Sequence, residues 1–143
     1  MEGLLAVVAA LAVASAVGLW LRRSGRRLAT RSTARNRADD VVLDAADLGA
    51  DLGERATLVQ FSTAFCQPCR ATRRILDDVS RQVDGVRHVE IDAESHLDLV
   101  RRLDVRRTPT VLVLDPSGRV VRRASGQPRP VDVIAALGAV ADA

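Results

Sequence analysis

The chain lacks lysine and tyrosine altogether, and it has few aromatic residues of any kind. All 21 basic residues are arginine, which excludes a phosphate-binding loop with its lysine, a Schiff-base enzyme and a kinase with a catalytic lysine. Two Phe and one Trp are the only aromatic residues. Because proteins that stack nucleic-acid bases need several aromatic faces, we expect no nucleic-acid partner.

The excess of positive charge is confined to the start of the chain. Residues 1–40 hold seven arginines against three acidic residues, which is a net charge of +4. Residues 41–143 hold 14 arginines against 15 acidic residues, which is a net charge of −1. The larger part of the chain therefore has no basic excess with which to bind a phosphate backbone.

A stretch near the N-terminus has no charged residue. Residues 3–21 are rich in Leu, Ala and Val, and as a helix they would be about 28 Å long, close to the roughly 30 Å hydrocarbon core of a bilayer. Trp20 at the end of the stretch suits the lipid–water interface. A cleaved signal peptide is one alternative for this stretch, and residues 14–16 (Ala-Ser-Ala) resemble a cleavage site, but a signal peptide would need a basic start. A buried core helix is the other alternative, but it would need a polar face.

The sequence thus predicts one N-terminal transmembrane helix, an anchor over residues 1–21 that contacts membrane lipid through residues 3–21. A basic juxtamembrane linker follows over residues 22–40, and it contains seven arginines. By the positive-inside rule, we expect this linker and the body of the chain to face the cytoplasm.

Residues 41–143 alternate between strand and helix patterns, which predicts one α/β domain. Apolar and β-branched runs predict strands over 57–62, 86–91, 110–114 and 120–124. Helical spacing predicts a weak helix over 44–52 that ends at Gly53, and further helices over 66–83, 95–103 and 129–141. The inward positions of the last two helices include Leu97 and Ile134. The expected fold is an α/β sandwich with a mixed central sheet.

The only two cysteines, Cys66 and Cys69, form a Cys-x-x-Cys pair between a predicted strand and a predicted helix, which is typical of a dithiol redox site. Free backbone N–H groups and the dipole at the helix start favour a thiolate on Cys66, while Cys69 lies one turn further in and is more buried. A metal site would need His88 and His96 at a spacing that fits no zinc-finger template. A permanent disulfide would close a loop too short to stabilise the fold much. We therefore expect reversible dithiol chemistry and no metal.

Beyond these arguments, the chain resembles the thioredoxin family over about residues 41–143. The segments that carry the resemblance are LVQFSTAFCQPC (58–69), VEID (89–92), RRTPTVLVLD (106–115) and the hairpin that runs into Gly126. The resemblance implies a thioredoxin-like three-layer sandwich, with Cys66 as the attacking thiol and Cys69 as the resolving one. It also implies a cis bond between Thr108 and Pro109. The substrate-binding residues would then be Phe65, Gln67, Pro68, Thr108 and Pro109.

The sequence departs from this family around the cysteines. Gln60 stands where thioredoxins usually have a buried Asp that assists proton transfer at the resolving cysteine, and a Gln side chain cannot titrate. His88 stands where the family often has a Lys on the neighbouring strand, and strand alternation points both side chains to the same side of the sheet. We hypothesise that His88 supplies the titrating group that Gln60 lacks; the alternative is an ordinary, partly exposed histidine. Phe65 and Ser62 replace two aromatic residues, so the docking surface is smaller.

Together these features predict a membrane-tethered protein-disulfide reductase that needs no bound cofactor. Its partners would be disulfide-containing protein substrates and a separate thiol or flavoprotein reductase as the electron donor. Two alternatives stay open at this point. One is an exported disulfide oxidase or isomerase of the same fold, and the other is a non-enzymatic, membrane-anchored adaptor whose thiols sense the redox state.

Overall fold

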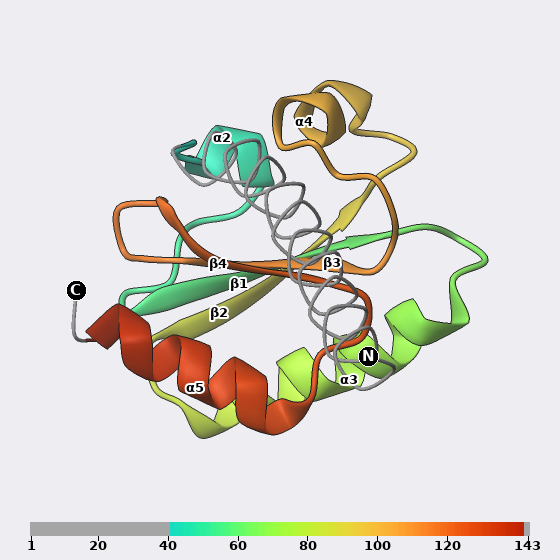
Figure 1. The fold of residues 1–143 in the computed structure, drawn as a ribbon. Helices are drawn as coiled ribbons and strands as arrows, with labels where there is room; N and C mark the ends of the chain where they lie inside the picture. The colour runs from blue at the N-terminus through green and yellow to red at the C-terminus, as the bar shows by residue number, and fades with distance from the viewer. Residues whose placement is uncertain (1–40, 142–143) are drawn as a thin grey trace, which may run out of the picture. The chain divides into compact units, whose positions relative to one another are not determined.

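The computed structural model describes residues 41–141 of the protein (Figure 1). The predicted anchor over residues 1–21 and the predicted linker over residues 22–40 lie outside the described residues and stay predictions. Within residues 41–141, no helix is both long enough and apolar enough to cross a membrane.

Strands and helices follow one another much as the sequence predicts. In chain order they are α2 (Ala45–Leu48), β1 (Ala56–Ser62), α3 (Gln67–Gln82), β2 (Val86–Asp92), α4 (Leu97–Arg102), β3 (Thr110–Leu114), β4 (Val120–Ser125) and α5 (Pro130–Ala141). The strands form one sheet in the order β2-β1-β3-β4. Strand β1 is parallel to β2 and antiparallel to β3, and β3 is antiparallel to β4, so the predicted mixed sheet is confirmed.

Helices cover both faces of the sheet and give the predicted three layers. In Figure 1, α2 and α4 lie on one side of the sheet, and α3 and α5 lie on the other. Each face has its own apolar core: Phe61 and Leu103 belong to the core on the α2 and α4 side, and Leu58 and Leu76 belong to the core on the α3 and α5 side. Burial of these two apolar surfaces is the main favourable term that holds the layers together.

The central strand β1 is buried along its whole length. Since side chains alternate between the two faces of a strand, Val59 and Phe61 pack on the α2 and α4 side, whereas Leu58 and Gln60 face α3. The strand ends at Ser62, and the chain then turns into α3. This connection places the cysteine pair at the end of a fully buried strand.

Helix α2 ends earlier than the sequence predicts. It spans four residues and stops at Gly49, whose φ is +65°, so the predicted end at Gly53 is wrong. Asp44 caps the helix by accepting a hydrogen bond from the N–H of Asp47 at 2.9 Å. The left-handed conformation at Gly49 then directs the chain out of the helix.

Two apolar residues that were predicted to face inward are exposed. Leu97 is 52 % exposed and Ile134 is 51 % exposed. In α4 the buried residue is Leu99, and Leu103 at the C-cap is buried as well. In α5 the buried residues are Val133 and Leu137. Because successive residues of a helix point about 100° apart, a shift of one or two positions is enough to turn a side chain from the core to solvent.

A tight turn closes the hairpin between β3 and β4. The Asp115 carboxylate accepts hydrogen bonds from the N–H of Ser117 (2.9 Å) and the N–H of Arg119 (3.0 Å). Gly118 has a φ of +83°, and its carbonyl accepts the N–H of Leu43 at 2.9 Å. A Cβ at Gly118 would lie 1.9 Å from the Leu43 carbonyl oxygen, so both the backbone angle and the close contact require glycine.

Replacement of Gly118 by alanine is therefore expected to destabilise the fold strongly. The change Gly118→Ala adds a steric overlap to the cost of a left-handed backbone, and we expect a loss of at least about 3 kcal/mol in the free energy of unfolding. Gly49→Ala is the matched control, because its φ is also positive but nothing lies within 4 Å of its Cβ. It should cost only about 1–2 kcal/mol in chemical denaturation of the full chain. Equal losses for the two variants would contradict the assignment.

Candidate functional site

The cysteine pair lies at the start of α3 and is oxidised in the structure. The sulfur atoms of Cys66 and Cys69 are 2.06 Å apart, and their Cα atoms are 5.2 Å apart. Cys66 is the N-cap residue of α3, and its sulfur accepts a hydrogen bond from the N–H of Cys69 at 3.2 Å. Pro68 in the first turn has no N–H to leave unpaired. When the disulfide is reduced, the same N–H and the helix dipole favour a thiolate on Cys66.

The two cysteines differ in exposure. Cys66 is partly exposed, whereas Cys69 is 1 % exposed. Phe65, directly before Cys66, is fully exposed, and Gln67 and Pro68 are exposed as well. A substrate can therefore reach Cys66 but not Cys69, which agrees with the predicted attacking and resolving roles.

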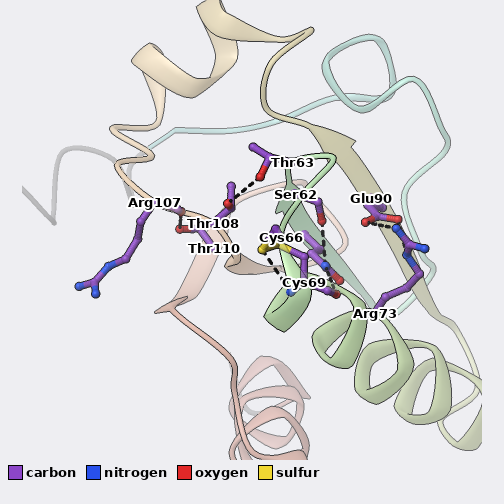
Figure 2. Close-up of a disulfide and its surroundings, with 10 residues drawn as sticks. Ser62, Thr63, Cys66, Cys69, Arg73, Glu90, Arg107, Thr108 and Thr110 are labelled. Atoms are coloured by element: carbon purple, nitrogen blue, oxygen red, sulfur yellow. Dashed lines mark hydrogen bonds and ion pairs between the residues drawn. A yellow bond between two sulfur atoms is a disulfide. The ribbon is translucent and has the colours of Figure 1, made fainter.

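A second loop lies beside the pair. The bond between Thr108 and Pro109 is cis, as the resemblance implied. The hydroxyls of Thr63 and Thr108 are 3.2 Å apart, and this contact ties the loop before Cys66 to the cis-proline loop (Figure 2). The Pro109 carbonyl accepts the N–H of Gly126 at 2.7 Å, which holds the loop from its other side. The structure thus brings together the residues predicted at 65–69 and at 108–109.

Gln60 lies directly behind the disulfide and is completely buried. Its side-chain N–H₂ donates to the Cys69 carbonyl at 2.9 Å and to the Ser62 hydroxyl at 2.9 Å. Its Oε1 atom has no partner within residues 41–141. The predicted position of Gln60 beside the resolving cysteine is therefore correct, and its amide holds the first turn of α3 against β1.

His88 does not lie beside Gln60. In the register of β1 and β2, His88 is paired with Leu58, and the residue paired with Gln60 is Glu90. The His88 side chain is 7 % exposed, and its Nδ1 atom lies 2.6 Å from the carboxylate of Asp77 on α3. His88 and Gln60 do face the same side of the sheet, but the structure does not link them, and the proton-transfer role stays a hypothesis.

The charged residues nearest to Gln60 were not predicted as site residues. Arg73 forms a forked ion pair with Glu90, with Nε–Oε2 at 2.6 Å and NH2–Oε1 at 2.7 Å (Figure 2). Burial raises the pKa of the Glu90 carboxyl, but hydrogen bonds from Arg73 and Ser62 and the charge of Arg73 outweigh it, so the pKa lies below its usual value. The ion pair therefore stabilises the fold fully at pH values above the usual pKa of a glutamate carboxyl. This stabilisation is lost as the pH falls through the lowered pKa of Glu90.

Two spacings in the sequence point to this ion pair. Arg73 follows Cys69 by four residues, which is one helical turn, and Glu90 follows His88 by two residues, which is the same face of a strand. That Glu90, and not His88, lies opposite Gln60 is known only from the register between β1 and β2. Within the described part of the chain, no three His, Cys, Asp or Glu side chains are grouped as a metal site requires.

The family model of thioredoxin matches residues 41–138. The chain belongs to the thioredoxin family. Chloroplastic thioredoxin Y of Oryza sativa subsp. japonica is 28 % identical over 111 residues, which cover 77 % of this chain and 66 % of the rice protein, just under two thirds. Thioredoxin C-2 of Corynebacterium nephridii is 29 % identical over 77 residues, which cover 53 % of this chain and 71 % of the bacterial protein.

Solved thioredoxins share the fold of this family member. The structure of a variant thioredoxin from Halobacterium salinarum superposes with a TM-score of 0.57 at 19 % sequence identity. The superposition covers 66 % of this chain and 80 % of the other. The predicted resemblance over residues 41–143 is thus confirmed at the level of family and fold.

The hypothesis for His88 predicts a measurable change in this thioredoxin-family chain. If His88 supplies a proton-transfer group, His88→Gln should shift the pH profile of disulfide reduction, because glutamine keeps hydrogen bonding but cannot titrate. His96→Gln is the control, since His96 is the other histidine and is exposed on the turn before α4. The hypothesis fails if the initial rate of insulin reduction, measured from pH 5.5 to 9, follows the same profile in both variants and in the parent chain.

Proposed function

We propose that the protein reduces protein disulfides through the Cys66/Cys69 dithiol. The observation that carries the proposal is the asymmetry of the pair at the start of α3, with a partly exposed Cys66 and a buried Cys69. Membership in the thioredoxin family supports a thiol–disulfide oxidoreductase. The reductive direction is the part that we propose here.

The reaction proceeds in two exchanges. The Cys66 thiolate attacks one sulfur of the substrate disulfide, the substrate S–S bond breaks, and the other substrate sulfur leaves and takes up a proton. The Cys69 thiol then loses its proton and attacks the Cys66 sulfur. This second exchange forms the Cys66–Cys69 disulfide and releases the reduced substrate. A separate thiol or flavoprotein reductase must return two electrons to the pair before the next cycle.

The substrate polypeptide is expected to lie across Phe65 and the cis-proline loop. Phe65 is fully exposed and offers an apolar contact beside Cys66. Within residues 41–141, the backbone N–H and C=O of Thr108 have no hydrogen-bond partner. An extended substrate segment can pair with these groups as an added strand does, which would align its disulfide with the Cys66 sulfur.

Cysteine variants test whether the chain is an enzyme. Cys66→Ser should abolish the reduction of insulin disulfides, because it removes the nucleophile. Cys69→Ser should leave the nucleophile but remove the resolving thiol, so it should accumulate a mixed disulfide with substrate on non-reducing gels. Insulin reduction that survives Cys66→Ser would mean that the activity does not depend on this pair. A parent chain that binds partners but reduces none would be an adaptor, and either result contradicts the proposal.

The reduction potential of the pair tests the direction of electron flow. A potential near roughly −270 mV, as in reducing thioredoxins, is the expected result for a reductase. A value near about −120 mV belongs to a strong oxidant and would favour the exported oxidase. Equilibration of the full chain with glutathione or dithiothreitol buffers, followed by alkylation of free thiols, measures this value.

We also propose that residues 1–21 anchor the chain in a membrane with the thioredoxin domain in the cytoplasm. The proposal rests on the uncharged stretch over residues 3–21 and on the seven arginines that follow it. A membrane-impermeant maleimide, applied after mild reduction, should label Cys66 only once expressing cells are permeabilised. Cys66→Ser/Cys69→Ser is the control for background. Labelling of intact cells would place the domain outside, and recovery without membranes would contradict the anchor.

A further inference from the structure

A cavity of about 310 Å³ lies next to the redox pair. It is lined by Ser62, Thr63, Ala64, Arg73, Glu90 and Asp92. Ser62 is the last residue of β1, Thr63 and Ala64 belong to the loop that leads into Cys66, and the others come from α3 and from the end of β2. In Figure 2, Ser62, Arg73 and Glu90 lie on one side of the disulfide, and Thr108 lies on the other. The volume is at the lower end of ligand pockets, and it suits one long side chain better than a cofactor.

Small residues create this space. Ser62 and Ala64 present short side chains to the cavity, and the Ser62 hydroxyl is held by Gln60 at 2.9 Å. Ser62 is 7 % exposed, so it forms part of the floor. An aromatic residue at position 62 would occupy the volume that this chain leaves open. The cavity is therefore a consequence of the small residues at the end of β1.

The charges that line the cavity favour a positively charged occupant. The guanidinium of Arg73 already forms the forked ion pair with Glu90. An anion that enters the cavity would have to displace the Glu90 carboxylate in order to bind Arg73. The remaining charge is the exposed carboxylate of Asp92. No cation of residues 41–141 forms a salt bridge with it at 4.0 Å or less. The hydroxyl of Ser95 and the N–H of Glu94 lower the pKa of the Asp92 carboxyl, which keeps it ionised at neutral pH.

The cavity adjoins the loop before Cys66, near which the substrate is proposed to bind. Thr63 lines the cavity, and its hydroxyl is also 3.2 Å from the hydroxyl of Thr108 on the cis-proline loop. A polypeptide that runs past Thr108 on one side of the disulfide and continues beyond Cys66 would meet the cavity on the other side. Ala64, which lines the cavity, is only two residues before Cys66 in the chain.

We propose that this cavity is a specificity subsite that takes a lysine or arginine side chain next to the cysteine of the substrate polypeptide, with Asp92 as its ionic partner. The inference rests on the proposed disulfide reductase function. It assigns a specificity-determining role to Asp92 and a space-making role to Ser62 and Ala64. The Arg73–Glu90 pair closes one wall of the subsite and rejects acidic side chains.

Peptides that carry a thionitrobenzoate mixed disulfide on their single cysteine test the subsite. Attack by Cys66 on the peptide sulfur releases the coloured thionitrobenzoate, and Cys69 then releases the peptide thiol. Three peptides differ only in the residue after the cysteine, which is Lys, Gln or Glu. With the full chain reduced beforehand and the reductant removed, we expect the second-order rate constant for thionitrobenzoate release in a single turnover to be about two- to fivefold higher for the Lys peptide than for the Gln peptide, because the ion pair is partly exposed. The Glu peptide should be the poorest, and added salt should reduce the preference.

Two variants complete the test. Asp92→Asn should bring the ratio of the single-turnover rate constants for the Lys and Gln peptides to about one. Asp84→Asn, which removes an exposed carboxylate that does not line the cavity, should leave the ratio unchanged. Equal rates for all three peptides with the parent chain, or a preference for Glu, would overturn the subsite and leave the reductase function intact. Retention of the Lys preference in Asp92→Asn would also overturn it. If the parent chain reduces none of the peptides and no insulin, the proposed function itself is wrong.

Discussion

The redox pair depends on the burial of strand β1 between two helical layers. Every residue of β1 is buried, and each of its faces is covered by a separate apolar core. This double burial holds β1 in the interior of the sheet. The chain leaves β1 at Ser62 and begins α3 at Gln67, directly after the N-cap residue Cys66. The N-terminus of α3, with its free N–H groups, is thereby held at the end of the sheet. The exposure of Cys66 and the burial of Cys69 both follow from this arrangement.

Behind the pair, the chain uses a neutral amide where its family usually has a buried carboxyl. Gln60 is buried without charge, so it avoids the cost of desolvating an ion and binds the Cys69 carbonyl instead. The charged groups lie further out, at the edge strand β2, where Glu90 and Arg73 neutralise each other. The chemistry at Cys69 must therefore obtain its proton acceptor from solvent, from the substrate or from a group such as His88. The same edge, where Ser62 leaves space, contains the cavity that we assign to substrate selection.

Much of the fold could be predicted because its signals are local. The alternation of apolar runs and helical spacing indicates the strands and longer helices, and the Cys-x-x-Cys pair at a strand-to-helix junction indicates the chemistry. The errors occur where the local signal is weak. Helix α2 is only four residues long, and its end at Gly49 depends on one backbone angle. The inward faces of α4 and α5 depend on a rotation of one or two residues, and this rotation is decided by packing on the sheet, which placed Leu97 and Ile134 in solvent.

The class of protein, the redox pair and the cis-proline loop could be predicted from the sequence, since each depends on residues close together in the chain or on a spacing of blocks shared with the family. Which side chains contact one another across the fold follows from the packing of distant segments. The pairing of Gln60 with Glu90 rather than His88 comes from the register of two parallel strands, which neither strand encodes alone. The contact between Thr63 and Thr108 joins loops 45 residues apart. The cavity beside Cys66 likewise forms where residues 62–64, α3 and the end of β2 come together. The end of β2 is far from residues 62–64 in the chain, so no local sequence pattern predicts the cavity.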